Sequence, residues 1–326
     1  MTLSELITAE ETLSSKVTGD PEVAGVTQNS AAVMPGSVFF AVAGSRADGH
    51  AFVESAIAKG AAAVVVERET VFDAHPSVVL VSSTRRQLGV SASRWYGKPT
   101  EKLRLVGITG TNGKTTTSYL LRELWDKAGL VSGMLGTVEY LVGNEVLPSN
   151  LTTPDALSLQ ELFHRMVGAK VTYAAMEVSS IALDQARTGG CTFDTAVFTN
   201  LTQDHLDYHH TMEEYYRAKL RLFDEYPLRT AVINQDDPWG ARLLNETIAS
   251  RRLGFSLLAK DAAFYVHSVS YEKAGTRARI TTPEGELDLK LGLIGRHNLY
   301  NVAGSLAAAH ALGMDLRAAA DAMTTV

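Results

Sequence analysis

The stretch LRLVGITGTNGKTT, residues 103–116, decides how the middle of this 326-residue sequence folds. Its apolar beginning, Leu103–Thr109, has the length and composition of a buried strand, and residues Lys114–Ala128 have helical spacing. A glycine-rich loop joins the two. Glycine lets the backbone come close to a phosphate, and the N–H groups at the start of a helix attract its negative charge. The stretch therefore predicts a strand–loop–helix unit that binds a nucleoside triphosphate, ATP being the expected one.

The residues of this loop are candidates for binding ATP: Gly110, Thr111, Asn112, Gly113, Lys114, Thr115 and Thr116. We expect Lys114 to reach the β- and γ-phosphates and the Thr115 hydroxyl to bind Mg²⁺. The spacing departs from the G-x-x-x-x-G-K-[ST] pattern, because Ile108 stands where that pattern has its first glycine. The alternative is an ordinary strand–turn–helix connection, which the Gly-Lys-Thr run at the junction disfavours.

After the loop, apolar strand candidates alternate with helical patterns, which predicts a parallel sheet with helices on both faces. The strand candidates are Val131–Leu135, Val171–Glu177, Thr195–Thr199 and Thr230–Ile233. Residues Phe264–Leu293 are instead typical of antiparallel strands with a turn at Thr282–Gly285. Two alanine-rich helices are expected from Asn298 onward.

The first hundred residues predict a separate, smaller α/β unit. Strands are expected at Ser37–Val42, Ala61–Glu67 and Val78–Ser82, with helices at about His50–Lys59 and at Thr84–Tyr96. The run Gly97-Lys98-Pro99 is a turn signal and a plausible boundary. We therefore expect an α/β protein with domains at residues 1–98 and 99–326, the second a mostly parallel sheet with a small antiparallel extension.

Composition limits the function classes. The formal net charge of −6 argues against a nucleic-acid-binding protein, and no apolar run approaches the roughly 20 residues of a membrane span. The N-terminal residues lack a basic-then-apolar signal pattern. The single cysteine, Cys191, excludes an internal disulfide. We expect a cytoplasmic monomer whose partners are small molecules, with neither nucleic acid nor membrane among them.

Five motifs together resemble the Mur ligase family, whose members build the peptide of bacterial cell-wall precursors and to which folylpolyglutamate synthetase is related. The motifs are GTNGKTT at 110–116, EVSS at 177–180, TNLTQDHLDYH at 199–209, YRAKLRLF at 216–223 and GRHNLYN at 295–301. Their order along the chain makes a chance match negligible. The resemblance implies an ATP- and Mg²⁺-dependent ligase of peptidoglycan synthesis, and with it a part in cell-wall biogenesis, cell shape and cell division.

The N-terminal region resembles one subgroup of this family. Asn29-Ser30, PGSVFFA at 35–41 and GSRADGH at 44–50 are similar to the uridine-nucleotide domain of the ligases that add the third amino acid. Those ligases join meso-diaminopimelate or L-lysine to UDP-MurNAc-L-Ala-D-Glu. LTTP at 151–154 and the run 179–187 favour the same subgroup. Two departures, Asn29-Ser30-Ala31 for Asp-Ser-Arg and Ile181 for histidine, lie near the expected substrate.

The resemblance assigns catalytic roles to Lys114, Glu177, His205 and Lys219, and metal ligation to Thr115, Glu177, His205 and Lys219. In the family the lysine matching Lys219 is carbamylated by CO₂, which turns a cation into an oxygen ligand suited to Mg²⁺. From the residues alone, the alternative for Lys219 is a helical lysine with a buried stem and a solvated head, and the alternative for Glu177 is a helix N-cap or a surface acid. His205 and His209 have the i,i+4 spacing of a zinc pair, but no third ligand matches them. His209 and His210 are expected to be solvated or capping residues.

By the same resemblance, Asn298 and Asn301 hydrogen-bond the adenine, although two asparagines at a helix start are also typical caps. Two further sets of residues are candidates for the UDP-MurNAc-dipeptide, each with a solvated surface role as the alternative. The uridine-nucleotide set is Ser30, Ser45, Arg46 and Ala47, and the muramoyl-peptide set is Thr152, Thr153, Ser179, Gln185 and Arg187.

The implied chemistry is amide ligation through an acyl phosphate. Family members have a third, C-terminal Rossmann-like domain that receives the incoming amino acid and completes the ATP site, and residues 1–326 match only the first two domains. We therefore expect this chain to be a truncated form that binds nucleotide and ligates poorly or not at all. The alternatives are another Mur ligase subtype, a folylpolyglutamate-synthetase-like ligase, a P-loop kinase or NTPase without the UDP-sugar domain, and a non-catalytic nucleotide-binding module.

Overall fold

The computed structural model describes residues 1–44 and 47–325 and divides into two compact units. Unit 1 comprises Met1–Pro99, Asp155–His164 and Gln185–Cys191. Unit 2 comprises Thr100–Pro154, Arg165–Asp184 and Thr192–Val326. The first segment of unit 1 ends at Pro99, one residue after the expected boundary at residue 98. Two short segments of the expected second domain, Asp155–His164 and Gln185–Cys191, pack with unit 1.

Unit 1 is built on a five-stranded sheet in the order β1-β5-β4-β3-β2. Strands β2 to β5 are parallel, and only β1 is antiparallel to its neighbour. The side chains of β3, β4 and β5 are all buried, which explains their unbroken apolar runs. The strands are β1 (Ser14–Ser15), β2 (Gly25–Thr27), β3 (Ser37–Phe40), β4 (Ala63–Val66) and β5 (Val78–Leu80).

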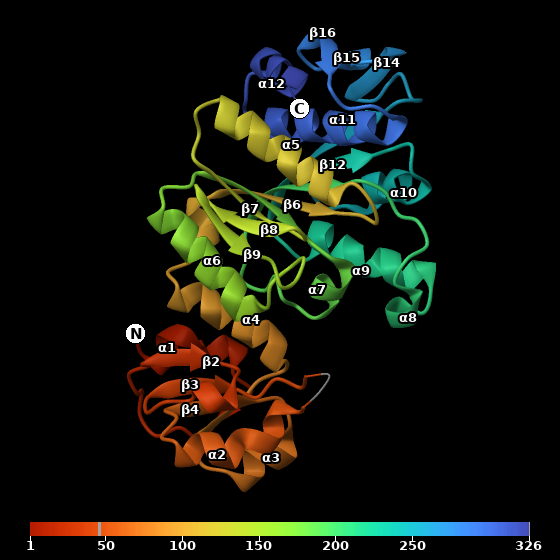
Figure 1. The fold of residues 1–326 in the computed structure, drawn as a ribbon. Coiled ribbons are helices and arrows are strands. Elements are labelled where there is room, and N and C mark those ends of the chain that lie inside the picture. The colour runs from red at the N-terminus through yellow and green to blue at the C-terminus, as the bar shows by residue number, and fades with distance from the viewer. Residues whose placement is uncertain (45–46, 326) are drawn as a thin grey trace. The chain divides into compact units, whose positions relative to one another are not determined.

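Helices cover both faces of this sheet. Successive strand residues point to opposite faces, so Phe40 packs with Leu6 and Leu88 while Phe39 packs with Val53 and Phe72. The helices α1 and α4 therefore lie on one face and α2 and α3 on the other (Figure 1). Their bounds are α1 (Leu3–Leu6), α2 (Val53–Ala58), α3 (Glu69–Ala74) and α4 (Thr84–Trp95), with 3₁₀ turns at Ala9–Glu11, Ser30–Ala32 and Gly49–Phe52.

Unit 2 contains an eleven-stranded sheet in the order β16-β15-β14-β13-β12-β11-β6-β10-β7-β8-β9. The seven strands from β14 to β7 in this order are parallel to their neighbours, and both ends are antiparallel. The strands are β6 (Arg104–Thr109), β7 (Ser132–Leu135), β8 (Glu139–Val142), β9 (Glu145–Pro148), β10 (Tyr173–Glu177), β11 (Phe193–Phe198), β12 (Leu228–Asn234), β13 (Arg251–Ser256), β14 (Phe264–Glu272), β15 (Gly275–Thr282) and β16 (Gly285–Leu291).

The antiparallel extension expected at Phe264–Leu293 is confirmed as β14, β15 and β16, and Thr282 pairs with Gly285 across the expected turn. The second extension, formed by β8 and β9, was not predicted. Its two strands are joined by Gly143-Asn144, a hairpin signal that the sequence carries. The α/β class with a small unit and a larger, mostly parallel sheet is confirmed.

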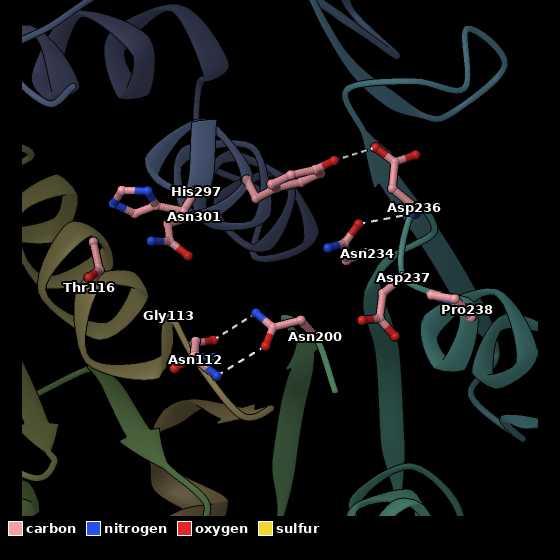
Figure 2. A pocket seen from close by; sticks show the side chains of 11 residues that line it. Asn112, Gly113, Thr116, Asn200, Asn234, Asp236, Asp237, Pro238, His297 and Asn301 are labelled. Carbon is pink, nitrogen blue, oxygen red and sulfur yellow. Dashed lines mark hydrogen bonds between the residues drawn. The ribbon is translucent and has the colours of Figure 1, made fainter. Parts of the chain in front are cut away.

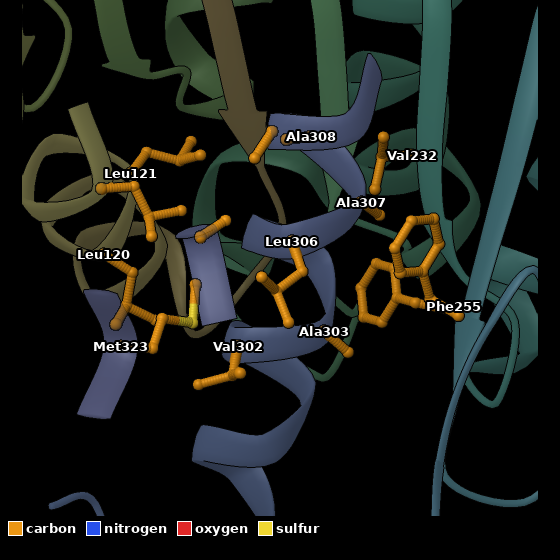
Figure 3. Close-up of a cluster of buried hydrophobic side chains, with 14 of the residues drawn as sticks. Leu120, Leu121, Val232, Phe255, Val302, Ala303, Leu306, Ala307, Ala308 and Met323 are labelled. Atoms are coloured by element: carbon orange, nitrogen blue, oxygen red, sulfur yellow. The ribbon is translucent and has the colours of Figure 1, made fainter. Parts of the chain in front are cut away.

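The core of unit 2 lies between the sheet and the helices α5 and α11 (Figures 1 and 3). Leu120, Leu121 and Leu306 pack there against the strands. Gly107 points to the opposite face, toward Leu222 of α9. The helices are α5 (Lys114–Lys127), α6 (Ala156–Gly168, its first part in unit 1), α7 (Ser180–Asp184), α8 (Leu206–His209), α9 (Met212–Asp224), α10 (Pro238–Glu246), α11 (Arg296–Ala311) and α12 (Leu316–Ala322), with 3₁₀ turns at Pro99–Lys102 and Met323–Thr325.

The parallel register places the ends of β6, β10 and β11 at one edge. Glu177, the last residue of β10, pairs with Ile108 of β6, and Phe198 of β11 pairs with Thr109. The segments that follow these strands therefore emerge together at the carboxyl edge of the sheet, where ligands of open α/β sheets bind. Across the described parts of the chain, no helix is long and apolar enough to cross a membrane.

Candidate functional site

The glycine-rich loop leaves β6 and enters α5 through two glycines in the left-handed half of backbone space. Gly110 has φ +144° and Gly113 has φ +87°. A Cβ at Gly110 would lie 1.9 Å from Thr199 Oγ1, and one at Gly113 would lie 2.4 Å from Asn301 Oδ1. Both positions thus require glycine for backbone conformation and for space. The loop is closely covered by the residues that follow β11 and by α11.

Polar contacts to the segment after β11 hold this loop in place. The Asn200 side chain accepts from Asn112 N–H (3.1 Å) and donates to Asn112 C=O (3.0 Å). Thr199 Oγ1 also donates to Asn112 C=O (2.6 Å). Thr111 Oγ1 exchanges hydrogen bonds with the backbone of Thr202. The loop is therefore fixed before any ligand arrives.

Two lysines converge on the loop. Lys114 Nζ donates to the carbonyls of Gly110 (3.0 Å) and Thr111 (2.9 Å), and Lys219 Nζ also donates to Gly110 C=O (2.9 Å). Burial lowers the pKa of Lys114, and the charges of Glu177 and Asp204 oppose that effect. When both amines are charged, they repel each other. Anionic oxygens, such as those of a polyphosphate, would stabilise both charges.

Lys219 is 1% exposed, and its amine has an unusual environment. Burial first, and then the neighbouring charge of Lys114, hold the pKa of Lys219 well below its ordinary value, with Asp204 opposing. Its Nζ lies 4.6 Å from the centre of the Tyr215 ring. Within residues 1–44 and 47–325, no carboxylate forms an ion pair with Lys219. The interpretation as a lysine with a solvated head is therefore wrong.

Glu177 is buried at the end of β10, with 1% of its surface exposed. Its Oε2 accepts from Thr115 Oγ1 and from Thr137 Oγ1, both at 3.0 Å, and its Oε1 accepts from Thr137 N–H at 3.0 Å. The predicted ligands Thr115 and Glu177 are thus in direct contact. The interpretation of Glu177 as a helix cap receives no support, because its carboxylate points to the loop and to Thr137.

His205 and Lys219 flank the same ring. His205 has φ +52°, its side chain is 47% exposed, and it meets Tyr215 edge-on with ring centres 6.1 Å apart. The Tyr215 hydroxyl contacts Thr111 Oγ1 at 3.2 Å. The structure therefore gathers the four predicted metal ligands as two pairs: Thr115 with Glu177, and Lys219 with His205 around Tyr215.

His209 was expected to be a solvated or capping residue, but it is buried. Its ring is 5% exposed and stacks on Tyr215 with centres 5.2 Å apart, and Nε2 lies 2.9 Å from Ser180 Oγ. Packing between α8, α7 and α9 produces this burial, and burial lowers the pKa of His209. His209 thus supports Tyr215, the residue that covers Lys219.

A cavity of about 590 Å³ opens beside the loop. Figure 2 shows Asn112 and Asn200 on one side of it, Asp236 and Asp237 after β12 on another, and Asn301 projecting from α11. Asn301 Nδ2 contacts Asn298 Oδ1 at 3.4 Å, and Asn298 Nδ2 donates to Ile294 C=O. The predicted pair thus lies together on α11, with Asn301 at the cavity.

Several cavity residues were missed by the sequence analysis. Asp236 accepts from Tyr300 Oη (2.8 Å), while Asp237 caps α10 and accepts from Leu201 N–H (3.0 Å). The polar run NQDDP that directly follows the strand ending at Asn234 was the available signal, because ligand contacts collect after the strands of such sheets. The residues missed are Asn200, Asn234, Asp236, Asp237, Pro238, His297 and Tyr300.

Three residues of the predicted muramoyl-peptide set lie together in unit 2. Thr153 Oγ1 donates to Glu177 C=O (2.9 Å) and accepts from Ser179 N–H (3.1 Å). Thr152 Oγ1 lies 3.1 Å from Thr137 Oγ1. The Thr153 hydroxyl therefore lies next to the backbone of Glu177, and the Thr152 hydroxyl lies next to Thr137, which contacts the Glu177 carboxylate.

Four of the other predicted substrate residues belong to unit 1, namely Ser30, Ala47, Gln185 and Arg187. Ser30 follows β2 and Ala47 follows β3, two parallel neighbours whose ends share one edge. Ser30 C=O accepts from Lys59 Nζ (2.6 Å). Ser45 and Arg46 lie outside the described residues. Gln185 Oε1 accepts from both Nε and Nη2 of Arg187, at 3.2 and 2.8 Å.

Comparison with known families decides what the chain is related to. The Mur ligase middle domain matches residues 108–309, and the Mur ligase family catalytic domain matches residues 22–96. The chain belongs to the Mur ligase family. The loop, Glu177, His205, Lys219 and Asn301 all lie in the part of this Mur ligase that matches the middle domain.

Known relatives point to one subgroup. The UDP-N-acetylmuramoyl-L-alanyl-D-glutamate–2,6-diaminopimelate ligase of Geobacillus kaustophilus is 42% identical over 94% of this chain and 64% of its own length. A solved diaminopimelate ligase of the same name has a TM-score of 0.85 at 32% identity, over 93% of this chain and 63% of its own. The MurF ligase of Thermotoga maritima in complex with ADP, at 23% identity and a TM-score of 0.57 over 92% of this chain and 65% of its own, shares the fold. The chain thus spans about 64% of the curated relative's length.

The residues of this Mur ligase fit a hard divalent cation. The buried Glu177 carboxylate receives hydrogen bonds and forms no ion pair with any residue that the structure describes, and the Thr115 hydroxyl beside it is a second oxygen donor. Among the described residues, no group of three or more His, Cys, Asp or Glu side chains is arranged to hold a metal ion. The missing ligands would therefore come from threonine, phosphate, water or a modified lysine.

Proposed function

We propose that this Mur ligase chain binds Mg·ATP and UDP-MurNAc-L-Ala-D-Glu for the ATP-dependent addition of a third amino acid, meso-diaminopimelate, in peptidoglycan precursor synthesis. The observation that carries the proposal is the convergence of Lys114, buried Glu177 and buried Lys219 on one glycine-rich loop. The choice of diaminopimelate rests on the names of the relatives.

The triphosphate would lie along the loop from Gly110 to Thr116, with Lys114 at its β- and γ-phosphates. For this, Lys114 exchanges its two carbonyl contacts for phosphate oxygens, which bind an ammonium more strongly. The adenine would occupy the cavity beside Asn301, whose amide offers a donor and an acceptor. Asn298 would support Asn301 from within α11.

Thr115 and Glu177 would hold a Mg²⁺ ion, with His205 and modified Lys219 as ligands of a second. Bound there, the cation neutralises charge on the phosphates and on the attacking carboxylate. The arrangement supports this role for Glu177, since a carboxylate buried to 1% exposure is costly unless cationic charge lies close to it.

We propose that Lys219 carries a carbamate, as N6-carboxylysine. An amine attacks CO₂ only in its neutral form, and burial together with Lys114 keeps the pKa of Lys219 low. The nitrogen lone pair forms a bond to the CO₂ carbon, the nitrogen loses one proton, and an anionic carboxylate results. That anion would then pair with Lys114, whose charge disfavours the protonated form of the unmodified amine.

The acceptor would use residues of both sets. Ser30, Ser45, Arg46 and Ala47 are the proposed uridine-nucleotide contacts. Thr152, Thr153 and Ser179 are the proposed muramoyl-peptide contacts, and the fork of Arg187 beside Gln185 suits a carboxylate or phosphate oxygen.

In the proposed reaction the D-glutamate carboxylate attacks the γ-phosphorus, forming an acyl phosphate and releasing ADP. The amine of diaminopimelate then attacks the acyl carbon, loses a proton, and expels inorganic phosphate. The loop and Lys114 hold the phosphates in position and balance their charge, which is where such enzymes gain most of their rate.

Calorimetry with two acceptors tests the proposal. UDP-MurNAc-L-Ala-D-Glu should bind the chain more tightly than UDP-MurNAc-L-Ala, because only the first carries the D-glutamate carboxylate. If ATP binds but neither acceptor does, the chain is another ATP-binding member of the fold and the assigned subgroup is wrong.

A further inference from the structure

The Glu177 carboxylate is held by a residue that no assigned role includes. Thr137 follows β7 and reaches Glu177 twice, through its N–H to Oε1 and its hydroxyl to Oε2. Gly136 provides the room, since a Cβ there would lie 2.4 Å from Glu177 Oε1. Glu177 thus lies against the Gly136-Thr137 turn on one side and against Thr115 on the other.

Proton counting fixes the direction of the hydrogen bonds. An ionised carboxylate only accepts, and a threonine hydroxyl has a single proton. Thr137 therefore gives its proton to Glu177, and in its 3.1 Å contact with Thr152 it must accept. The result is a directed chain in which Thr152 donates to Thr137 and Thr137 donates to Glu177.

This chain connects two sites with different proposed ligands. Glu177 and Thr115 form the proposed metal end, while Thr152 belongs to the proposed muramoyl-peptide set. Because its proton is used by Thr137, the Thr152 hydroxyl presents lone pairs to a ligand and suits an N–H group of the acceptor. Thr137 is itself solvent-exposed, so its hydroxyl lies at the open side of a buried carboxylate.

We propose that Thr137 is a positioning residue that holds Glu177 for the Mg·ATP complex and orients the Thr152 hydroxyl toward the acceptor. This inference rests on the proposed function. The backbone N–H to Oε1 is retained in valine and serine variants of Thr137, so the side-chain hydroxyl alone carries the predicted effect on Oε2.

The test compares ATP affinity in Mg²⁺ and in EDTA by calorimetry, which isolates the metal-dependent part of binding. Thr137→Val, of nearly the same shape, should reduce the ratio of the two affinities about fivefold and leave the EDTA value unchanged. Thr137→Ser, which keeps the hydroxyl, should retain the wild-type ratio. Thr172→Val is the matched control, an exposed threonine beside the opposite end of β10. Thermal unfolding of each variant checks the fold.

Each outcome decides a different question. If wild-type ATP binding is absent or independent of Mg²⁺, the proposed function itself fails. If the wild type depends on Mg²⁺ and Thr137→Val keeps its ratio, the proposed function stands and the role of Thr137 is refuted. A variant that loses affinity equally in EDTA has a damaged loop, which also refutes it.

A double-variant cycle tests the link to Thr152. Thr152→Val should reduce acceptor affinity, and adding Thr137→Val should cost little more, because both break the same chain. Additive losses in acceptor affinity would show that the two hydroxyls act independently and would overturn the link.

Discussion

Replacing Gly113 by alanine tests whether the close packing of the glycine-rich loop against Asn301 of α11 is needed for ATP binding. Gly113 has φ +87°, where an L-residue is strained, and the added Cβ would lie 2.4 Å from Asn301 Oδ1 and 3.3 Å from Asn301 Cγ. Asn301 is 6% exposed and touches Asn298, so its amide must rotate away from the loop and from the cavity.

The expected losses of folding stability and of ATP affinity follow from the strained backbone and from the displaced Asn301. The left-handed backbone costs about 1–2 kcal/mol for alanine. The displaced Asn301 loses one or two hydrogen bonds to the adenine, each contributing about 1 kcal/mol. We expect the free energy of unfolding to fall by at least the first amount and ATP affinity to fall about tenfold.

Gly129→Ala is the matched control. Gly129 has φ +73° and lies at the far end of α5, but nothing lies within 4 Å of an added Cβ. It should lose a similar amount of stability and bind ATP as the wild type does. Calorimetry for ATP and urea unfolding for stability separate the two effects. Wild-type ATP affinity in a folded Gly113→Ala variant would refute the placement of the adenine beside Asn301.

Three further predictions concern other parts of the chain. Burial alone would raise the pKa of Glu11, but hydrogen bonds, first from Arg94, lower it from 4.5 to about 2. Glu11→Gln should therefore reduce the free energy of unfolding at pH 7 by about 1–2 kcal/mol, a value that allows for the partial exposure of the pair. Since this stabilisation is present above pH 4.5 and is lost as the pH falls through 2, urea unfolding of wild type and variant should converge in acid. With ¹³C-bicarbonate, the wild type should give a carbamate NMR signal that Lys219→Met abolishes; an unchanged signal would assign it to another amine. Asn200→Ala removes both contacts to Asn112 and should weaken ATP binding about tenfold with little change in Tm, and an unchanged affinity would mean that the loop is held without it.

Much of the site could be predicted from the sequence because its residues lie at the ends of parallel strands or directly after them. The run before Gly110 is apolar and unbroken, as a central parallel strand requires, and Glu177 stands at the end of a similar run. Since parallel strands end at one edge, two residues far apart in sequence could be expected to meet there.

The remainder depends on packing that local pattern does not encode. His209 is polar and follows a run of mostly polar residues, yet its ring stacks on Tyr215 because α8 packs against α9. Thr137 follows a short strand, and the partners of its hydroxyl, Glu177 at the end of the neighbouring β10 and Thr152, are far from it in sequence. The segments 155–164 and 185–191 join unit 1 through tertiary contacts that sequence order does not show.

Titration of Mg·ATP into the wild type and into Lys114→Met tests directly whether the glycine-rich loop binds the triphosphate. We expect one ATP site per chain and at least a tenfold loss of affinity in the variant, because Lys114 is the proposed cation for the β- and γ-phosphates. Equal affinities, with both proteins folded, would contradict the assignment of residues 110–116 as the triphosphate site.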